Sequence, residues 1–138
     1  MSERYHRGVE ILQQIGLSGR DAAANRVAEL APDFARMAIE FPYGDLWSRY
    51  ELDTPTRELG AIAALAALGN AIPQLRAHVS AALNAGCTRV QIVEILMQTS
   101  IFAGFPAALN AIEQCADLLS DGSDCDDCQA TRAKADQS

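Results

Sequence analysis

Residue types on which many enzymes depend are scarce in this sequence. Its 138 residues include a single lysine, Lys134 in a polar C-terminal segment, and only 2 histidines, His6 and His78. A chain with no lysine in its apolar part lacks the nucleophile of Schiff-base and pyridoxal-phosphate enzymes. The body of the chain contains neither a histidine and cysteine cluster at metal-ligand spacing nor a glycine-rich nucleotide-binding loop. We therefore expect a protein that uses no metal and no cofactor.

Clusters of positive charge and long apolar runs are also missing. The formal net charge is -7, and no stretch gathers several basic residues on one face, so we expect no nucleic-acid partner and no anionic membrane partner. No apolar run approaches the roughly 18 residues that a membrane-spanning helix needs. The first eight residues are polar and charged, unlike an apolar leader. These features predict a cytoplasmic protein.

Aromatic residues make up only 6% of the chain, whereas hydrophobic residues reach 49% and are mostly Ala, Leu, Ile and Val. This composition favours close packing of helices over a β-sandwich. No segment alternates with period two for long enough to be a convincing strand. We therefore expect an all-α domain over residues 1–119, a compact bundle of about six helices. Residues 120–138 are acidic and polar, and we expect them to form a disordered tail.

Prolines, glycines and capping residues mark the ends of the expected helices. Thr54 is the expected N-cap of a helix that ends before Gly69 and is apolar nearly all round, which is typical of a helix inside a bundle or a subunit interface. Thr88 and Gln91 match a capping box. Residues 45–53 have no clear period and are predicted to form a loop or short turn. The pattern predicts helices over residues 3–15, 21–30, 32–41, 55–68, 73–85, 89–103 and 106–119.

Two groups of motifs stand at a characteristic spacing. The first is FPYGDLWSR at residues 41–49, leading into TREL at residues 56–59. The second comprises LRAH at 75–78, NAG at 84–86, TR at 88–89, Ile92, Glu94, QT at 98–99 and GFPAA at 104–108. Together they resemble the carboxymuconolactone decarboxylase family, and the spacing holds across four helices over roughly residues 5–119.

The resemblance implies an all-α, alkylhydroperoxidase-like subunit that forms a homo-oligomer, a trimer or a hexamer. One branch of that superfamily uses a Glu, a CxxC pair and a His in thiol peroxidase chemistry. Glu58 and His78 stand near the matching places, but Asn70 and Pro73 lie where the cysteines would be. The other branch implies a cofactor-free carboxy-lyase that decarboxylates a small carboxylated lactone in aromatic-compound catabolism. The alternatives are a thiol redox protein or a non-catalytic oligomeric member of the family.

Decarboxylation without a cofactor requires a substrate that is its own electron sink, and a conjugated lactone carbonyl provides one by forming a dienolate. The protein must then supply a cation for the carboxylate, a donor for the enolate oxygen and an acid for the carbon. His78 is the leading acid/base candidate because imidazole exchanges protons near neutral pH. The alternative is a core histidine that binds a backbone carbonyl.

Arg49, which lies beside Trp47, is the leading candidate to bind the carboxylate, since a guanidinium binds carboxylates with two hydrogen bonds and the indole can form a pocket wall. The alternative for Arg49 is a loop ion pair with Asp45 or Glu51.

Arg57 and Glu58 are further candidates for the substrate-binding site. For Glu58 the preferred interpretation is structural, a buried pair with Arg57 or Arg76.

Glu94 lies on one helical stripe with Gln91 and Gln98. Such a stripe is usually a solvated face, and the alternative is that Glu94 lines the pocket and orients His78.

Cys87 and Cys115 are expected to be half-buried thiols. The CxxC pair of Cys125 and Cys128 has no nearby histidine, and we expect it to belong to the disordered tail.

Overall fold

The computed structural model of the protein describes residues 1–23 and 25–120, and every regular element in these ranges is helical. The predicted all-α class is therefore confirmed, while most of the predicted tail, residues 121–138, lies outside the described residues. None of the helices within the described ranges is long and apolar enough to cross a membrane. The elements are α1 (Glu3–Gln14), α2 (Gly19–Ala22), α3 (Asn25–Leu30), α4 (Pro32–Ile39), the π-helix η1 (Glu40–Trp47), α5 (Thr54–Leu68), α6 (Ile72–Asn84), α7 (Arg89–Ala103) and α8 (Phe105–Leu119).

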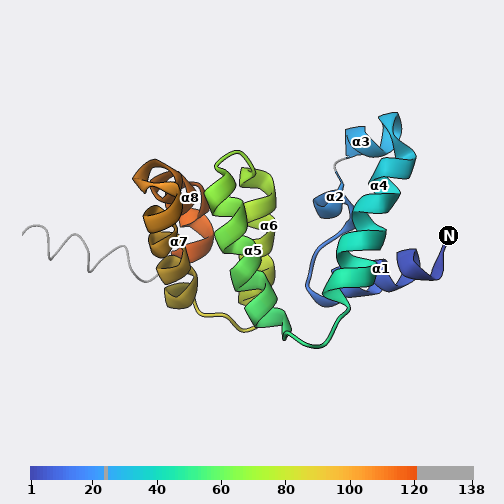
Figure 1. The fold of residues 1–138 in the computed structure, drawn as a ribbon, viewed down its shortest axis with the longest axis horizontal. Helices are drawn as coiled ribbons and strands as arrows, with labels where there is room; N and C mark the ends of the chain where they lie inside the picture. The colour runs from blue at the N-terminus through green and yellow to red at the C-terminus, as the bar shows by residue number, and fades with distance from the viewer. Residues whose placement is uncertain (24, 121–138) are drawn as a thin grey trace, which may run out of the picture.

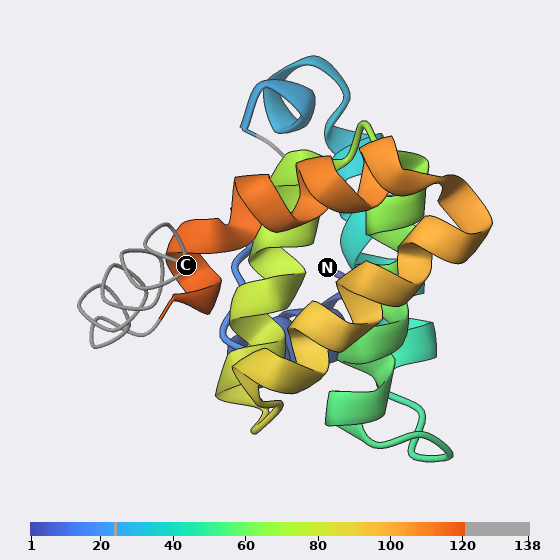
Figure 2. The same ribbon diagram turned by 90° about the vertical axis from the view of Figure 1, so that its left-hand side faces the viewer.

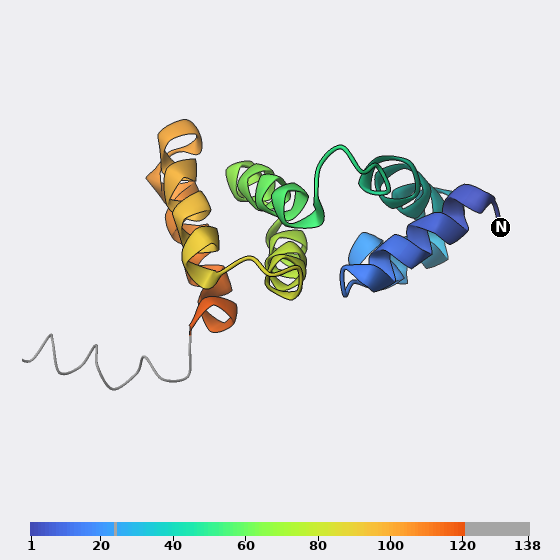
Figure 3. The same ribbon diagram turned by 90° about the horizontal axis from the view of Figure 1, so that it is seen from below.

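The helices are stacked in three layers along the long axis of the molecule. Figure 3 shows α7 with α8 at one end, α5 with α6 in the middle, and α1 with η1 and the N-terminal helices at the other end. In Figure 1 a single connection, residues 48–53, leads from η1 to α5. The middle layer, α5 with α6, therefore contacts both outer layers. Its residues on the side of α1 and η1 can connect the N-terminal helices to α5–α8.

Helices α5–α8 enclose an apolar core. Figure 2 shows α7 and α8 lying across α5 and α6. The predicted helix ends are largely confirmed here: Gly69 ends α5 with a φ of 77°, and the Thr88 and Gln91 capping box begins α7. The N-cap of α5 is Asp53 rather than the predicted Thr54, because the Asp53 carboxylate accepts a hydrogen bond from the Thr56 N–H at 2.8 Å. The core comprises Ile62, Ala66, Leu75, Val79, Ala82, Cys87, Ile92, Leu96, Ala111 and Cys115.

A second apolar cluster lies between α1, α4 and η1. It contains Leu12, Ile15, Leu17, Ile39 and Tyr43, and Ala81 of α6 completes it. The prediction of one helix over residues 21–30 is wrong in part: residues 21 and 22 end α2, and residues 25–30 form a separate short helix, α3. Because Ala81 belongs to α6, this cluster connects the N-terminal helices to the middle layer.

The predicted helix end at residues 42–44 and the predicted loop at residues 45–53 are wrong in part, because the chain stays helical through Trp47. The continuation is a π-helix, whose wider turn accommodates the ring of Pro42, which an α-helix interior disfavours. Gly44 lets α1 approach closely: a Cβ atom at this position would lie 2.2 Å from the carbonyl oxygen of Arg4. Proline and glycine thus mark a tight crossing of two helices rather than the end of a helix.

Candidate functional site

A buried carboxylate joins the three elements that meet between the two halves of the chain. Glu58 on α5 is fully buried, and its Oε2 lies 2.7 Å from Nδ1 of His78 on α6. Its Oε1 accepts a hydrogen bond of 3.2 Å from the indole Nε1 of Trp47 on η1. We assign the hydrogen of this pair to Nδ1 of His78, so that the imidazole donates and the carboxylate oxygen accepts. The other ring nitrogen, Nε2, is then the one placed to exchange a proton with a substrate.

One aromatic ring packs against the imidazole, and a second packs against the first. The ring centroid of Trp47 lies 5.7 Å from that of His78 and 5.8 Å from that of Tyr43. The side chain of His78 is only 11% exposed, so the pair with Glu58 is largely shielded from water. Burial, followed by the charge of Glu58, raises the pKa of Tyr43 to about 12, and its phenol therefore stays protonated at neutral pH.

Arg57 places a positive charge beside Trp47, next to the pair of Glu58 and His78. Its guanidinium carbon lies 5.9 Å from the centroid of the Trp47 ring, and its Nη2 donates to the backbone carbonyl of Arg49 at 3.3 Å. Its Nε is buried and has no hydrogen-bond partner among the described residues. A buried donor without an acceptor is costly, so this guanidinium has unused capacity to bind an anion.

The structure gives Glu58 partners other than those predicted. Its pair with Arg57 or Arg76 is not formed, because His78 and Trp47 occupy its two oxygens. Arg76 instead pairs with Asp117 of α8 at 2.6 Å. Glu58 therefore belongs to the cluster around His78, and the signal in the sequence was its position, one acidic residue on a helix that is apolar nearly all round.

Arg49 and Glu94 lie outside this cluster. Arg49 is exposed and forms an ion pair of 3.3 Å with Glu51, the alternative that the sequence left open. Glu94 is exposed on α7 together with Gln91 and Gln98, as expected for a solvated stripe. The Nδ1 of His78 is bound by Glu58, so the predicted orienting role does not fall to Glu94.

Tyr43 is the member of the cluster that was missed. The sequence placed it at a helix end, where no pattern of neighbours indicates burial. It is 6% exposed and packs against Trp47, because η1 continues the helix and brings residues 43 and 47 to the same side. The one local signal was the four-residue separation of Tyr43 and Trp47, which puts two aromatic side chains on the same side only if the chain stays helical past Pro42 and Gly44.

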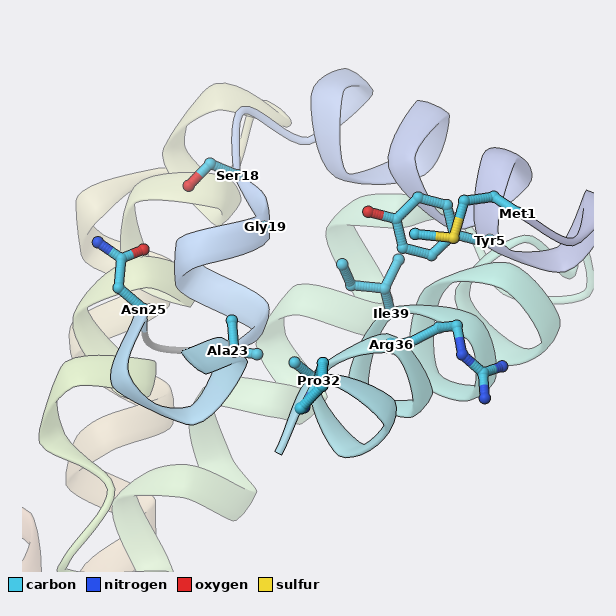
Figure 4. A pocket seen from close by; sticks show the side chains of 11 residues that line it. Met1, Tyr5, Ser18, Gly19, Ala23, Asn25, Pro32, Arg36 and Ile39 are labelled. Atoms are coloured by element: carbon cyan, nitrogen blue, oxygen red, sulfur yellow. The ribbon is translucent and has the colours of Figure 1, made fainter. Parts of the chain in front are cut away.

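A cavity of about 480 Å³ lies elsewhere, among α1, α2, α3 and α4, and neither Glu58 nor His78 lines it. Figure 4 shows Tyr5 and Ile39 on one side of it and Ala23 and Pro32 on another. The cluster and this cavity are therefore separate features. Across the described ranges, no group of three His, Cys, Asp or Glu side chains is placed to hold a metal ion.

Comparisons with known proteins point to a single family. The family model described as "Carboxymuconolactone decarboxylase family" matches residues 32–117, which include every residue of the cluster. The 4-carboxymuconolactone decarboxylase of Acinetobacter baylyi is 31% identical over 120 residues, covering 86% of this chain and 89% of that protein. An uncharacterized 15.0 kDa protein of Paracoccus denitrificans, from the nqo9-nqo10 intergenic region, is 40% identical over 86 residues, covering 62% of this chain and 64% of that protein.

Proposed function

The chain belongs to the carboxymuconolactone decarboxylase family, and from this premise we propose that it removes CO2 from a small carboxylated lactone of the carboxymuconolactone type, without a cofactor. Such a reaction would serve in the breakdown of aromatic compounds. The observation that carries the proposal is the buried pair of Glu58 and His78, 2.7 Å apart, next to a guanidinium with an unsatisfied buried N–H. The name of the relative from Acinetobacter baylyi supports the same class of substrate.

In the proposed reaction the bond between the ring carbon and the carboxylate breaks, and its electron pair moves through the conjugated system onto the carbonyl oxygen of the lactone. CO2 leaves, and the resulting dienolate is protonated on carbon to give the product lactone. His78 delivers this proton from Nε2 as the imidazolium, which carries a hydrogen on each ring nitrogen and has taken its Nε2 proton from water, because Nδ1 is held by Glu58. Glu58 acts through His78: it fixes the tautomer and the orientation of the ring.

Arg57 replaces Arg49 as the proposed carboxylate-binding residue. Arg49 is exposed and already paired with Glu51, so binding a substrate would require this ion pair to break. Arg57 is partly buried beside Trp47, and its Nε is without a partner in the described part of the chain. A guanidinium in such a site can bind a carboxylate through two parallel hydrogen bonds. Trp47 then keeps its predicted place as a wall of the site.

Turnover of 4-carboxymuconolactone, followed as CO2 release, tests this assignment. We expect the purified protein to be active and His78→Ala to be roughly 10² to 10⁴ times slower, the usual contribution of a general acid. Wild-type protein that forms its native assembly but releases no CO2 from this lactone would contradict the proposed substrate.

Two matched pairs of variants test the roles of the neighbouring residues. Glu58→Gln should lower kcat, whereas Glu94→Gln should not, because only Glu58 contacts His78. Arg57→Met should raise KM, whereas Arg49→Met should change it little, because only Arg57 has an unsatisfied donor beside the site. Equal effects within either pair would contradict the corresponding role.

The proposal includes a homo-oligomer, a trimer or a hexamer. Large apolar side chains remain exposed on the isolated chain, among them Phe34 and Phe41 on the N-terminal helices and Ile101, Phe102 and Phe105 around the α7–α8 turn. Apolar surface of this extent is typical of a protein that buries it against other subunits. A sedimentation experiment at micromolar concentration that finds only monomers would contradict this part of the proposal.

The thiol redox alternative has weaker support. Cys87 and Cys115 are both buried, and burial raises the pKa of each thiol, which reduces the fraction of reactive thiolate. The other two cysteines, Cys125 and Cys128, lie outside the described residues. Alkylation of the thiols should therefore leave lactone turnover largely intact.

A further inference from the structure

We propose that Asp45 is a positioning residue for the site: by fastening the π-helix η1 to α1, it keeps the indole of Trp47 on the Glu58 carboxylate. This inference rests on the proposed function for its consequence on turnover, but the placement of the indole can be measured without a substrate. Asp45 lies two residues before Trp47 on η1 and contacts neither Glu58 nor His78.

Asp45 binds two arginines of α1. Both of its carboxylate oxygens lie 3.0 Å from Nε of Arg4, and Oδ1 lies 3.5 Å from Nη2 of Arg7. The hydrogen bond from Arg4 is the largest cause that lowers the pKa of Asp45, which therefore remains ionised at neutral pH. One carboxylate thus connects residue 45 of η1 to two successive turns of α1.

The backbone next to Asp45 is also bound to α1. The carbonyl oxygen of Gly44 accepts hydrogen bonds from Nε of Arg7 at 2.6 Å and from Oγ of Ser48 at 2.7 Å. A Cβ atom on Gly44 would lie 2.2 Å from the Arg4 carbonyl, so the two backbones are in direct contact. The charges and the contact fix the distance and the rotation of η1 relative to α1 at one point.

Trp47 is sensitive to that rotation. Its indole reaches Glu58 through one hydrogen bond of 3.2 Å, at the long end of the normal range. A small rotation of η1 would break this bond and leave Oε1 of the buried Glu58 without its donor. The carboxylate would then be held only by its bond to Nδ1 of His78, the ring that it orients. Asp45 can therefore affect the site while touching none of its reacting groups.

The effect should be local rather than global. The side chains of Arg4 and Asp45 are 50% and 33% exposed, and exposed ion pairs contribute little to the stability of the whole fold. Losing the pair should increase local opening of η1 more than it changes the unfolding of the protein. This separation distinguishes a positioning residue from one that only stabilises the chain.

Hydrogen exchange of the indole N–H in the full-length protein, observed by NMR, tests the proposal. Trp47 is the only tryptophan of the chain, so a single indole resonance reports on this bond. We expect the exchange to be roughly three to ten times faster in Asp45→Asn than in the wild type. The urea midpoint should stay close to that of the wild type, and Asp45→Glu should restore slow exchange.

Asp117→Asn is the matched control, because it breaks a comparable pair with Arg76, which joins α6 to α8 and does not involve η1. We expect it to leave the indole exchange at the wild-type rate. Unchanged exchange in Asp45→Asn, or equally faster exchange in Asp117→Asn, would overturn the proposal.

Arg4→Gln removes the same pair from the α1 side and answers the same question if Asp45→Asn fails to fold. In turnover, both variants should lower kcat with little change in KM. An inactive wild type would refute the proposed function while leaving the exchange result to decide the role of Asp45.

Discussion

Helices α5–α8 are held together by apolar side chains, whereas α1 and η1 combine an apolar cluster with arginines, an aspartate and two glycines at their crossing. Among the core residues of the first region, Ile62, Leu75, Val79, Ile92 and Leu96 are all fully buried. In the second region, where α1 crosses the helix opposite it, Cβ atoms on Gly8 and Gly44 would lie 2.7 and 2.2 Å from backbone oxygens of the facing helix. The first region depends on the volume of its side chains, and the second adds a close backbone approach and charge to its apolar cluster.

The difference bears on function because the cluster around Glu58 lies where the two regions meet. Glu58 and His78 come from the apolar region, on α5 and α6, while Tyr43 and Trp47 come from η1. The well-packed helices can hold a buried carboxylate in a defined place, since they shield it from water and its two oxygens find donors. The aromatic wall is carried by the region that is fastened by charges, so the two sides of the site should respond differently to mutation.

The largest effect is expected from truncation of the apolar core. Leu75→Ala removes a fully buried side chain of α6 and leaves a cavity, so we expect the free energy of unfolding to fall by about 2–5 kcal/mol. Urea denaturation at a fixed protein concentration measures it. The control is Leu68→Ala on α5, where the same change removes a side chain that is 67% exposed and should alter stability by less than about 0.5 kcal/mol. Similar losses in both variants would show that the stability of this region does not come from its core.

A smaller loss is expected from filling the crossing of α1 and η1. In Gly44→Ala the new Cβ would meet the Arg4 carbonyl, a backbone atom that cannot turn away, so the two helices must separate. We expect a destabilisation of about 1–3 kcal/mol, typical of overpacking, together with a change in Trp47 fluorescence. An alanine variant with wild-type stability and emission would mean that the close approach is not needed to seat η1.

The two regions also differ in how well the sequence predicts them. In α5–α8 the helix ends are local properties of the chain: Gly69 takes a positive φ, and Thr88 and Gln91 cap each other across three residues. Such signals depend on neighbours along the chain, and the helices over residues 89–103 and 106–119 were predicted within one residue of the observed ends. In η1 the same local rules failed, since Pro42 and Gly44 normally end a helix. The side chains that bind η1 are Arg4 and Arg7 of α1, which lie 37 to 41 positions before their partners in the sequence, so these contacts cannot be read from the local pattern.

The candidate site shows the same limit. His78 and Trp47 could be named from their types, because few other residues can serve as an acid at neutral pH or form a wide apolar wall. The pairing of His78 with Glu58 rather than Glu94 could not, since both acids lie on predicted helices and only the packing of α5 on α6 decides which one reaches Nδ1. Arg49 and Arg57 likewise differ in burial and partners rather than in residue type.

A stabilising change sharpens the contrast between the glycines of the two regions. Gly60 lies inside α5, and a Cβ atom there would meet nothing within 4 Å. Gly60→Ala should therefore increase the free energy of unfolding by about 0.5–1 kcal/mol, because alanine loses less backbone entropy in a helix than glycine does. Gly44→Ala is the same substitution in the other region, and the change expected there in the free energy of unfolding has the opposite sign. A destabilised Gly60→Ala would mean that this face of α5 is covered in the native assembly.

The smallest effect is expected from the exposed ion pair of Arg76 and Asp117, which is the counterpart in α5–α8 of the Arg4 and Asp45 pair. The hydrogen bond from Arg76 is the main cause that lowers the pKa of Asp117 to about 2, below the value of about 3.9 in an unfolded chain. A lowered pKa in the folded state means that ionised Asp117 stabilises the fold above about pH 4, and that this contribution is lost as the pH falls towards 2. The stability of Asp117→Asn should thus fall below that of the wild type near neutral pH, and the two should converge in acid.

Urea unfolding at several pH values between 2 and 7 measures that convergence. Because the pair is exposed, the gap near neutral pH should be small, and it should shrink in high salt. Arg4 also lowers the pKa of the Asp45 carboxyl, so Asp45→Asn should give a similarly small and pH-dependent gap in stability. Unlike Asp117→Asn, it should also change the fluorescence and the indole exchange of Trp47. If the two variants instead gave the same fluorescence and the same exchange of the indole, the ion pair of Asp45 would affect Trp47 no more than the ion pair of Asp117 does. The charges of the N-terminal region would then have no special effect on the site.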